Sequence, residues 1–308
     1  MTETVSHGTL YVPTDPKGRQ FYADHETLWL LPKTEPDGSV TPGEPAIASA
    51  TSPLALFSAG GLLEELNERI FAAAVSAAAL VEDRPWGVAA DSARLVAETI
   101  WSTSAAASFA LDCADHVLSL PNATAVRLKS GETLADVVNA ARQWLADAGS
   151  GDAGLLGRVS RIALARHLRR SSDKVAALAF GRTVADEAAD IDAMDDPEWE
   201  AIAATRDAVL AAVDAVRHQA FPQLAERESA RYEEDLVNAS PEAEPIPTPW
   251  GTFVVGAPGG IVPASVAARD AAERARQAAA DAGGREAGAA ERAWQRDRLV
   301  AALHGGAA

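Results

Sequence analysis

The chain has 308 residues, of which 48% are hydrophobic and 23% charged, and its formal net charge is -17. This length and composition allow one large domain or two ordinary ones around a buried core, and they exclude the low hydrophobicity of disordered proteins. The negative charge repels phosphate backbones and anionic membranes, so it disfavours nonspecific binding to either.

The compartment is predicted from the cysteine content and from the absence of targeting patterns. Cys113 is the single cysteine, so an internal disulfide is ruled out. Residues 1–8 lack a basic region followed by an apolar run, and the most apolar stretch, 70–81, is shorter than the roughly 20 residues that cross a bilayer. We expect a cytoplasmic protein, and its arginine-rich, alanine-rich composition is typical of a GC-rich bacterial genome.

The first 53 residues predict a small β element followed by an extended arm. Residues 9–12 and 27–31 are β-prone, and residues 13–18 between them are rich in turn formers. Prolines then recur between 32 and 53 and prevent a helix from propagating. We expect a hairpin and a Pro-rich arm in residues 1–53.

Alanine, the best helix former, dominates the rest of the chain and predicts a mainly α fold. Apolar residues recur at helical spacing from Leu62 onward, and Thr133 is a good N-terminal cap. The predicted fold is therefore an all-α bundle of six or more helices in residues 54–238. The predicted helices are 62–83, 91–120, 133–148, 155–170, 173–194 and 197–237.

The C-terminal quarter is predicted to hold a linker and a last helix. Residues 239–262 are rich in Pro and Gly and contain a short strand candidate near residue 250. Residues 263–308 predict a polar helix that can fray, with Gly283, Gly284 and Gly288 as weak points.

Acidic residues on two of the predicted helices suggest a metal site: Glu64, Glu65 and Glu68 on the first, and Asp112 and Asp115 on the second. Carboxylates are the ligands that Mg²⁺ prefers, and the arrangement resembles the paired acidic helices of the all-α nucleotide pyrophosphohydrolases. The resemblance implies Mg²⁺ bound against a phosphorylated substrate. The sequence departs from that family in a longer gap between the two groups and in having no Glu three residues before Asp115. The candidate metal ligands are Glu64, Glu65, Glu68, Asp112, Asp115 and His116.

A basic tract in the middle of the chain has two interpretations. Its arginines can form ion pairs with the many carboxylates of an acidic protein, or they can form a phosphate, anion or nucleic-acid patch. Internal ion pairing is favoured. The tract includes Arg158, Arg161, Arg166, Arg169 and Arg170.

Nucleophile elbows, phosphate-binding loops and dinucleotide fingerprints are all missing from the sequence. The Pro-rich arm and the polar C-terminal helix are suited to docking on a protein partner or on a second copy of the chain. The first hypothesis is therefore a noncatalytic helical interaction or scaffold protein that needs no cofactor. One alternative is an Mg²⁺-dependent hydrolase of a phosphorylated small molecule on an all-α fold. A second alternative is a regulator that binds nucleic acid.

Overall fold

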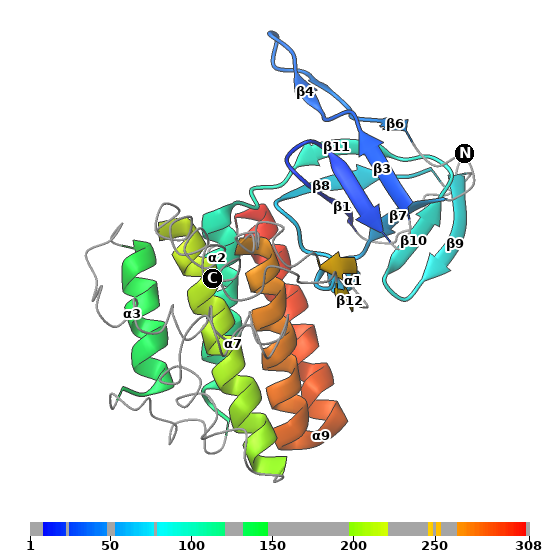
Figure 1. The fold of residues 1–308 in the computed structure, drawn as a ribbon. Coiled ribbons are helices and arrows are strands. Elements are labelled where there is room, and N and C mark those ends of the chain that lie inside the picture. Colours follow the sequence, from blue (N-terminus) through cyan, green and yellow to red (C-terminus); the bar gives the residue numbers. More distant parts are fainter. Residues whose placement is uncertain are drawn as a thin grey trace. The chain divides into compact units, whose positions relative to one another are not determined.

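The computed structural model describes residues 9–22, 25–47, 53–76, 79–120, 132–146, 197–220, 246–248, 251–253 and 264–305. The chain divides into two compact units, which are drawn together in Figure 1. Unit 1 consists of residues 1–105 with 292–308, and unit 2 of residues 106–291. The chain passes from one unit to the other within α2 (Thr103–Val117) and again within α9 (Ala264–His304).

Unit 1 is built on a six-stranded sheet in which every pair of neighbouring strands is antiparallel. Tyr11 pairs with Phe57 on one side and with Ala72 on the other, so the first strand lies in the middle of the sheet. In spatial order the strands are β11 (Arg94–Glu98), β8 (Arg69–Ala74), β1 (Leu10–Thr14), β7 (Leu54–Phe57), β10 (Gly87–Ala90) and β9 (Leu80–Arg84).

A second sheet of unit 1 has three strands, β2 (Arg19–Tyr22), β3 (His25–Trp29) and β6 (Pro45–Ile47). A tight turn joins β1 to β2. The Asp15 carboxylate accepts the backbone N–H groups of Lys17 and Arg19 at 2.8 and 2.9 Å. Gly18 closes this turn with φ 83°, and a Cβ there would stand 2.7 Å from the Trp29 carbonyl oxygen.

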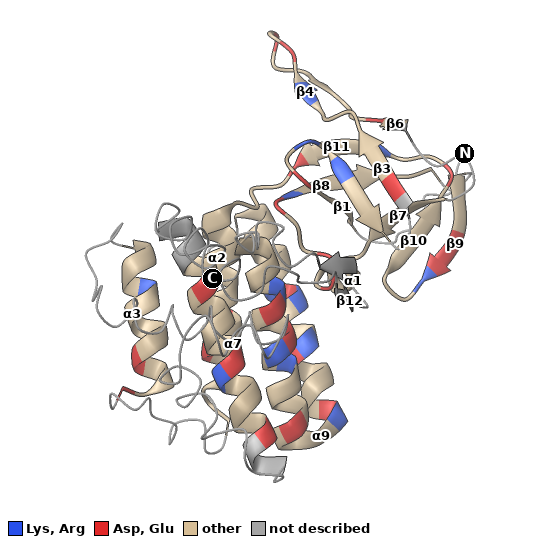
Figure 2. Ribbon diagram, viewed as in Figure 1, with Lys and Arg blue, Asp and Glu red and all other residues tan. Residues whose placement is uncertain are grey.

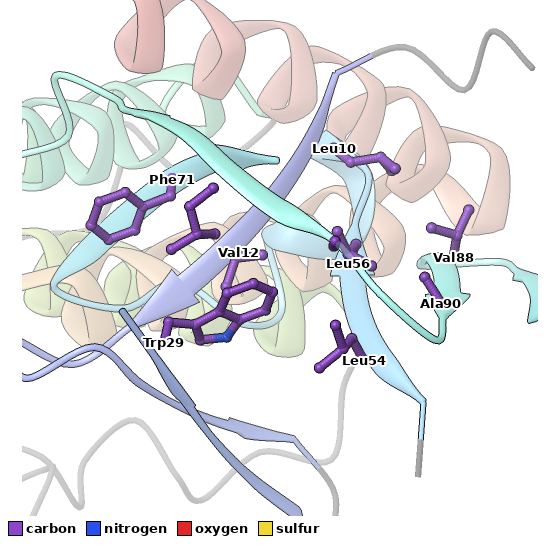
Figure 3. Packing of buried hydrophobic residues seen from close by; sticks show 10 residues of the cluster. Leu10, Val12, Trp29, Leu54, Leu56, Phe71, Val88 and Ala90 are labelled. Carbon is purple, nitrogen blue, oxygen red and sulfur yellow. The ribbon is translucent and has the colours of Figure 1, made fainter. Parts of the chain in front are cut away.

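The core of unit 1 lies between these two sheets (Figure 3). Alternate side chains from five strands of the large sheet and from β3 meet there, among them Leu10, Val12, Leu56 and Trp29. Gln20 of β2 connects the sheets, because its side chain accepts the Trp29 indole N–H at 3.1 Å and donates to the Ala55 carbonyl at 2.8 Å. The buried amide therefore has both a donor and an acceptor partner.

The other face of β1 contacts the end of α9 within unit 1. The Tyr11 hydroxyl lies 3.0 Å from His304 Nε2, and the Ile100 N–H donates to the Leu303 carbonyl at 3.2 Å. Leu299 and Leu303 are fully buried. The last turns of the chain thus form part of the same folded unit as its first strand.

Among its described residues, unit 2 contains four helices and a short hairpin. Alanine is the most frequent of its buried residues, and such small side chains let helix backbones approach closely. Gly284, at φ 79°, interrupts α9 and divides it into two arms; a Cβ on Gly288 would lie 2.8 Å from the Ala280 Cβ. The remaining elements are α3 (Leu134–Ala146), α7 (Pro197–Ala220), β12 (Ile246–Thr248) and β13 (Gly251–Phe253).

The predicted all-α bundle of six or more helices is wrong. The fold is mixed α/β, with five helices among the described residues and a large sheet. Residues 62–83, predicted as one helix, hold the end of the four-residue α1 (Ala59–Leu62), then β8 and most of β9; residues 91–120 hold β11 before α2 begins. Strand pairing with partners distant in sequence outweighs the helix preference of alanine in these segments.

Other predicted elements have different outcomes. The helix predicted at 133–148 is confirmed as α3, whereas those at 155–170 and 173–194 lie outside the described residues. The predicted strand near residue 250 corresponds to β13, paired with β12. In the described part of the chain, no helix has the length and apolarity needed to cross a membrane. The division into four segments stays a prediction.

Candidate interaction surface

A projecting hairpin, called here the finger (residues 31–42), connects β3 to β6. Its short strands are β4 (Lys33–Thr34) and β5 (Val40–Thr41), in which Thr34 pairs with Val40. Every residue from 33 to 42 is exposed, and Figure 1 shows the finger extending away from the two sheets of unit 1. Because it buries so little of itself, the finger contributes little to the core.

The base of the finger is held by backbone hydrogen bonds. The Leu30 N–H donates to the Glu44 carbonyl at 2.7 Å, and Gly43 exchanges two hydrogen bonds with Leu95 of β11 at 2.9 and 2.8 Å. A Cβ on Gly43 would come within 2.1 Å of the Leu30 carbonyl oxygen, so this position requires glycine. The finger therefore projects from a fixed point on the fold.

Large apolar side chains are exposed along this part of the chain. Among the described residues, Phe21, Leu30 and Val40 are 54%, 60% and 49% exposed, and we call them the apolar trio. Phe21 lies on the outer face of the three-stranded sheet, opposite the buried face of Gln20 and Trp29. Elsewhere in the described ranges, the exposed large apolar side chains are Val81, Val96 and Ile100.

Charged side chains lie close to Phe21 and on the finger. The Arg19 guanidinium carbon lies 5.6 Å from the centre of the Phe21 ring, and its Nε donates to Asp15 at 2.8 Å. Partial burial raises the pKa of Asp15, but hydrogen bonds from Arg19 and Lys17 outweigh it and hold the pKa below its usual value. The Ser39 hydroxyl and N–H lower the pKa of Asp37 at the finger tip. Both carboxylates are therefore ionised at neutral pH.

Three of the predicted metal ligands, Glu64, Glu65 and Glu68, lie in the loop between α1 and β8 rather than on a long helix. The Glu64 carboxylate accepts from Arg292 at 3.1 Å. Partial burial and the nearby charge of Asp15 raise the pKa of Glu68.

The other three predicted ligands lie on α2 in unit 2. Arg142 of α3 donates to Asp115 at 3.1 Å and forms an ion pair with Asp112 at 3.0 Å, so a single guanidinium group binds both carboxylates. His116 Nδ1 lies 2.6 Å from Glu291 Oε2, whose side chain is 4% exposed. These contacts join α2 to α3 and to α9.

The six candidates do not form a recognisable metal centre. Within the described ranges, no group of three or more His, Cys, Asp or Glu side chains is arranged to hold a metal ion. A guanidinium group already occupies the position between Asp112 and Asp115 that a cation would take. The magnesium site of the hydrolase hypothesis stays a prediction without an observation in its favour.

The predicted anion patch of Arg158, Arg161, Arg166, Arg169 and Arg170 lies outside the described residues. Its role in ion pairing or in phosphate binding stays a prediction.

The apolar trio was not predicted from the sequence. Prolines at 32, 36, 42 and 45 indicated an extended arm, and the arm is a hairpin with a fixed base. The alternation of Gln20, Phe21 and Tyr22 was the available signal, because a strand with one face buried must turn Phe21 outward. The alternation predicts an exposed Phe21 only if it is known which face of the strand packs against the core.

Comparisons with known proteins give no relative: no protein family model, no curated protein and no solved structure matches this chain. A function therefore has to be inferred from its own residues and geometry.

Proposed function

We propose that this chain is a noncatalytic interaction protein that binds a partner protein through the finger and the outer face of the β2–β3–β6 sheet. The observation that carries the proposal is the exposure of Phe21, Leu30 and Val40 on and beside a hairpin that is exposed throughout residues 33–42. Cytoplasmic localisation belongs to the same proposal, as does the absence of a cofactor.

Energetics favour a contact at this surface. Single exposed apolar side chains are common, but a contact that buries several of them together can dominate an interface. Full burial of a side chain such as Phe or Leu contributes about 1.5–3 kcal/mol. The backbone and side chains of the finger add to the area that a partner can contact. Because the core of unit 1 lies between the sheets, this contact does not require the core to open.

A fixed base also favours binding. The hydrogen bonds from Gly43 to Leu95 and from Leu30 to Glu44 hold the start and end of the finger in place. A pre-organised element loses less conformational entropy on association than a flexible arm does. The finger is thus better suited to specific docking than the extended arm that the sequence predicted.

The structure gives less support to the two alternative functions, magnesium-dependent hydrolysis and nucleic-acid binding. Asp112 and Asp115 are engaged by Arg142, which does not favour magnesium-dependent hydrolysis there. Nucleic-acid binding depends on the basic tract, which the described residues do not include.

The test begins with a benzophenone amino acid in place of Val40, and in place of Val81 as a matched control of similar exposure on β9. A partner crosslinked only from position 40 is then purified, and its affinity for the full chain is measured by calorimetry. Phe21→Ser with Leu30→Ser should weaken binding at least about 10-fold, the equivalent of about 1.4 kcal/mol. Val81→Ser should leave the affinity unchanged.

Two results would contradict the proposal. One is a purified partner that binds the Phe21→Ser, Leu30→Ser double variant as tightly as it binds the original chain. The other is crosslinking that is equal from positions 40 and 81, or absent from both. Circular dichroism and a thermal melt of the double variant serve as the folding control.

A further inference from the structure

We infer that the partner that docks on the apolar trio presents an apolar centre with a basic rim of Lys or Arg side chains. This inference rests on the proposed function and adds the chemistry of the partner. It is carried by the charges that surround the trio.

Acidic groups outnumber basic ones around the trio. Glu26 is directly opposite Phe21 in the β2–β3 ladder, and Glu35 and Asp37 lie on the finger. In the described part of the chain these three carboxylates have no ion-pair partner, although Glu35 accepts a hydrogen bond from the Thr41 hydroxyl at 2.9 Å. Lys33 is the one basic residue of the finger, whose acidic and basic residues are coloured in Figure 2.

The arginines near this surface are already paired. Arg19 is bound by Asp15 at 2.8 Å, and Arg94 faces Glu44 at 3.4 Å. Their charges are therefore offset locally, and the charges left next to the trio are the carboxylates of Glu26, Glu35 and Asp37 against the single ammonium group of Lys33, so acidic groups still predominate. A basic rim on the partner would offset these three charges when water is excluded.

The net charge of the whole chain also favours a basic partner. A net charge of -17 attracts a basic partner and repels a second copy of the same chain. Burying Glu26, Glu35 and Asp37 against identical carboxylates would be costly, so a homodimer through this face is disfavoured. Anionic membranes and nucleic acids are repelled for the same reason.

The test is a selection of random peptides displayed on phage against the full chain. The library is first depleted on the Phe21→Ser, Leu30→Ser double variant, so that the remaining binders need the trio. We expect the enriched peptides to carry an aromatic or aliphatic centre flanked by Lys or Arg. The most enriched one is synthesised, and its affinity is measured by fluorescence anisotropy at low and at physiological ionic strength.

The expected affinity falls roughly 5- to 10-fold between the two ionic strengths, because salt screens exposed charges. A Glu26→Gln, Glu35→Gln, Asp37→Asn variant should bind about 10-fold more weakly and with little remaining salt dependence. A Glu82→Gln, Asp83→Asn variant of the edge strand β9 is the matched control and should bind as the original chain does.

The outcomes separate this inference from the proposed function. Enriched peptides that are neutral or acidic, or whose affinity ignores salt and the triple variant, would overturn the basic partner while leaving the docking surface intact. A selection that returns no peptide dependent on the trio would overturn the docking surface itself. Dimerisation of the full chain at micromolar concentration that Phe21→Ser abolishes would assign the surface to a second copy and overturn the basic partner.

Discussion

Gly60 and Gly61 are neighbours in α1, but their surroundings differ. A Cβ on Gly60 would have one contact, 3.8 Å from the Ser58 hydroxyl. A Cβ on Gly61 would stand 2.1 Å from the carbonyl oxygen of Trp86. That carbonyl also accepts the Ser58 N–H at 2.9 Å, so the β9–β10 turn is fixed against α1 and cannot move away easily.

Alanine substitutions at these two glycines should therefore have opposite effects. Gly61→Ala should lower the free energy of unfolding by about 3 kcal/mol, because it forces two backbone segments apart. Gly60→Ala should raise it by roughly 0.4–1 kcal/mol, since it restricts the unfolded chain at an unstrained helical position. Urea titrations of both variants measure the difference, and equal stabilities would show that the α1 contact is misplaced.

Asp15 and Glu68 predict opposite dependences of stability on pH. The folded-state pKa of Asp15 is lowered, so its stabilisation is present above the unfolded pKa and is lost as pH falls through the folded value. The folded-state pKa of Glu68 is raised by partial burial and by Asp15, so its ionisation destabilises the fold as pH rises through that value.

Melting temperatures measured as a function of pH test the predicted effects of Asp15 and Glu68. Glu68→Gln should be more stable than the original chain at pH 7, and the difference should vanish below about pH 4, near the pKa of an unfolded glutamate. Asp15→Asn should be less stable at pH 7, with a difference that shrinks in acid. A Glu68→Gln variant that melts at the same temperature as the original chain at pH 7 would contradict the raised pKa of this carboxyl group.

At the scale of elements, the finger is predicted to be dispensable for folding. Replacing residues 33–41 with a short Gly-Ser link should change the free energy of unfolding by less than about 1 kcal/mol, because loop length has a small effect on stability. The same variant should lose binding to the selected peptide. A large loss of stability would show that the finger serves the fold instead of a partner.

Helix α3 shows what local sequence can predict. The Thr133 hydroxyl accepts the Asp136 N–H at 3.1 Å, and the Asp136 carboxylate accepts the Thr133 N–H at 2.8 Å. This reciprocal cap uses residues only three positions apart. Leu134, Val137 and Trp144 are buried as the helical spacing predicts. Both signals lie within the helix itself.

Strand β8 shows why the rest could not be predicted. Its alanines favour a helix locally, but its partners are β1 and β11, at Leu10 and Leu95 opposite Ala73. Pairing over such distances leaves no local pattern. The gap between the predicted helices 62–83 and 91–120 contains a turn at Pro85 and Trp86, and this turn joins two strands instead of two helices.

The same limit applies to the candidate surface. Local spacing brought Asp112 and Asp115 together correctly on one helix, but not Arg142, which binds both from α3. Exposure of the apolar trio depends on which sheet faces are covered, and that depends on the register of strands far apart in sequence. The finger could be located by its prolines, whereas its fixed base at Leu95 could not.

For the whole molecule, we expect the partner to bind to unit 1 alone. Unit 1 holds the finger and the trio, while the described part of unit 2 consists mainly of alanine-rich helices. Binding at the finger should therefore leave the backbone amides of α3 and α7 unaffected.

Hydrogen–deuterium exchange of the full chain, with and without the selected peptide, locates the binding surface. Exchange is expected to slow in residues 30–44 and in β2 and β3, with no change in β9. Protection that appears in unit 2 or along β9, with none in the finger, would contradict docking at the finger.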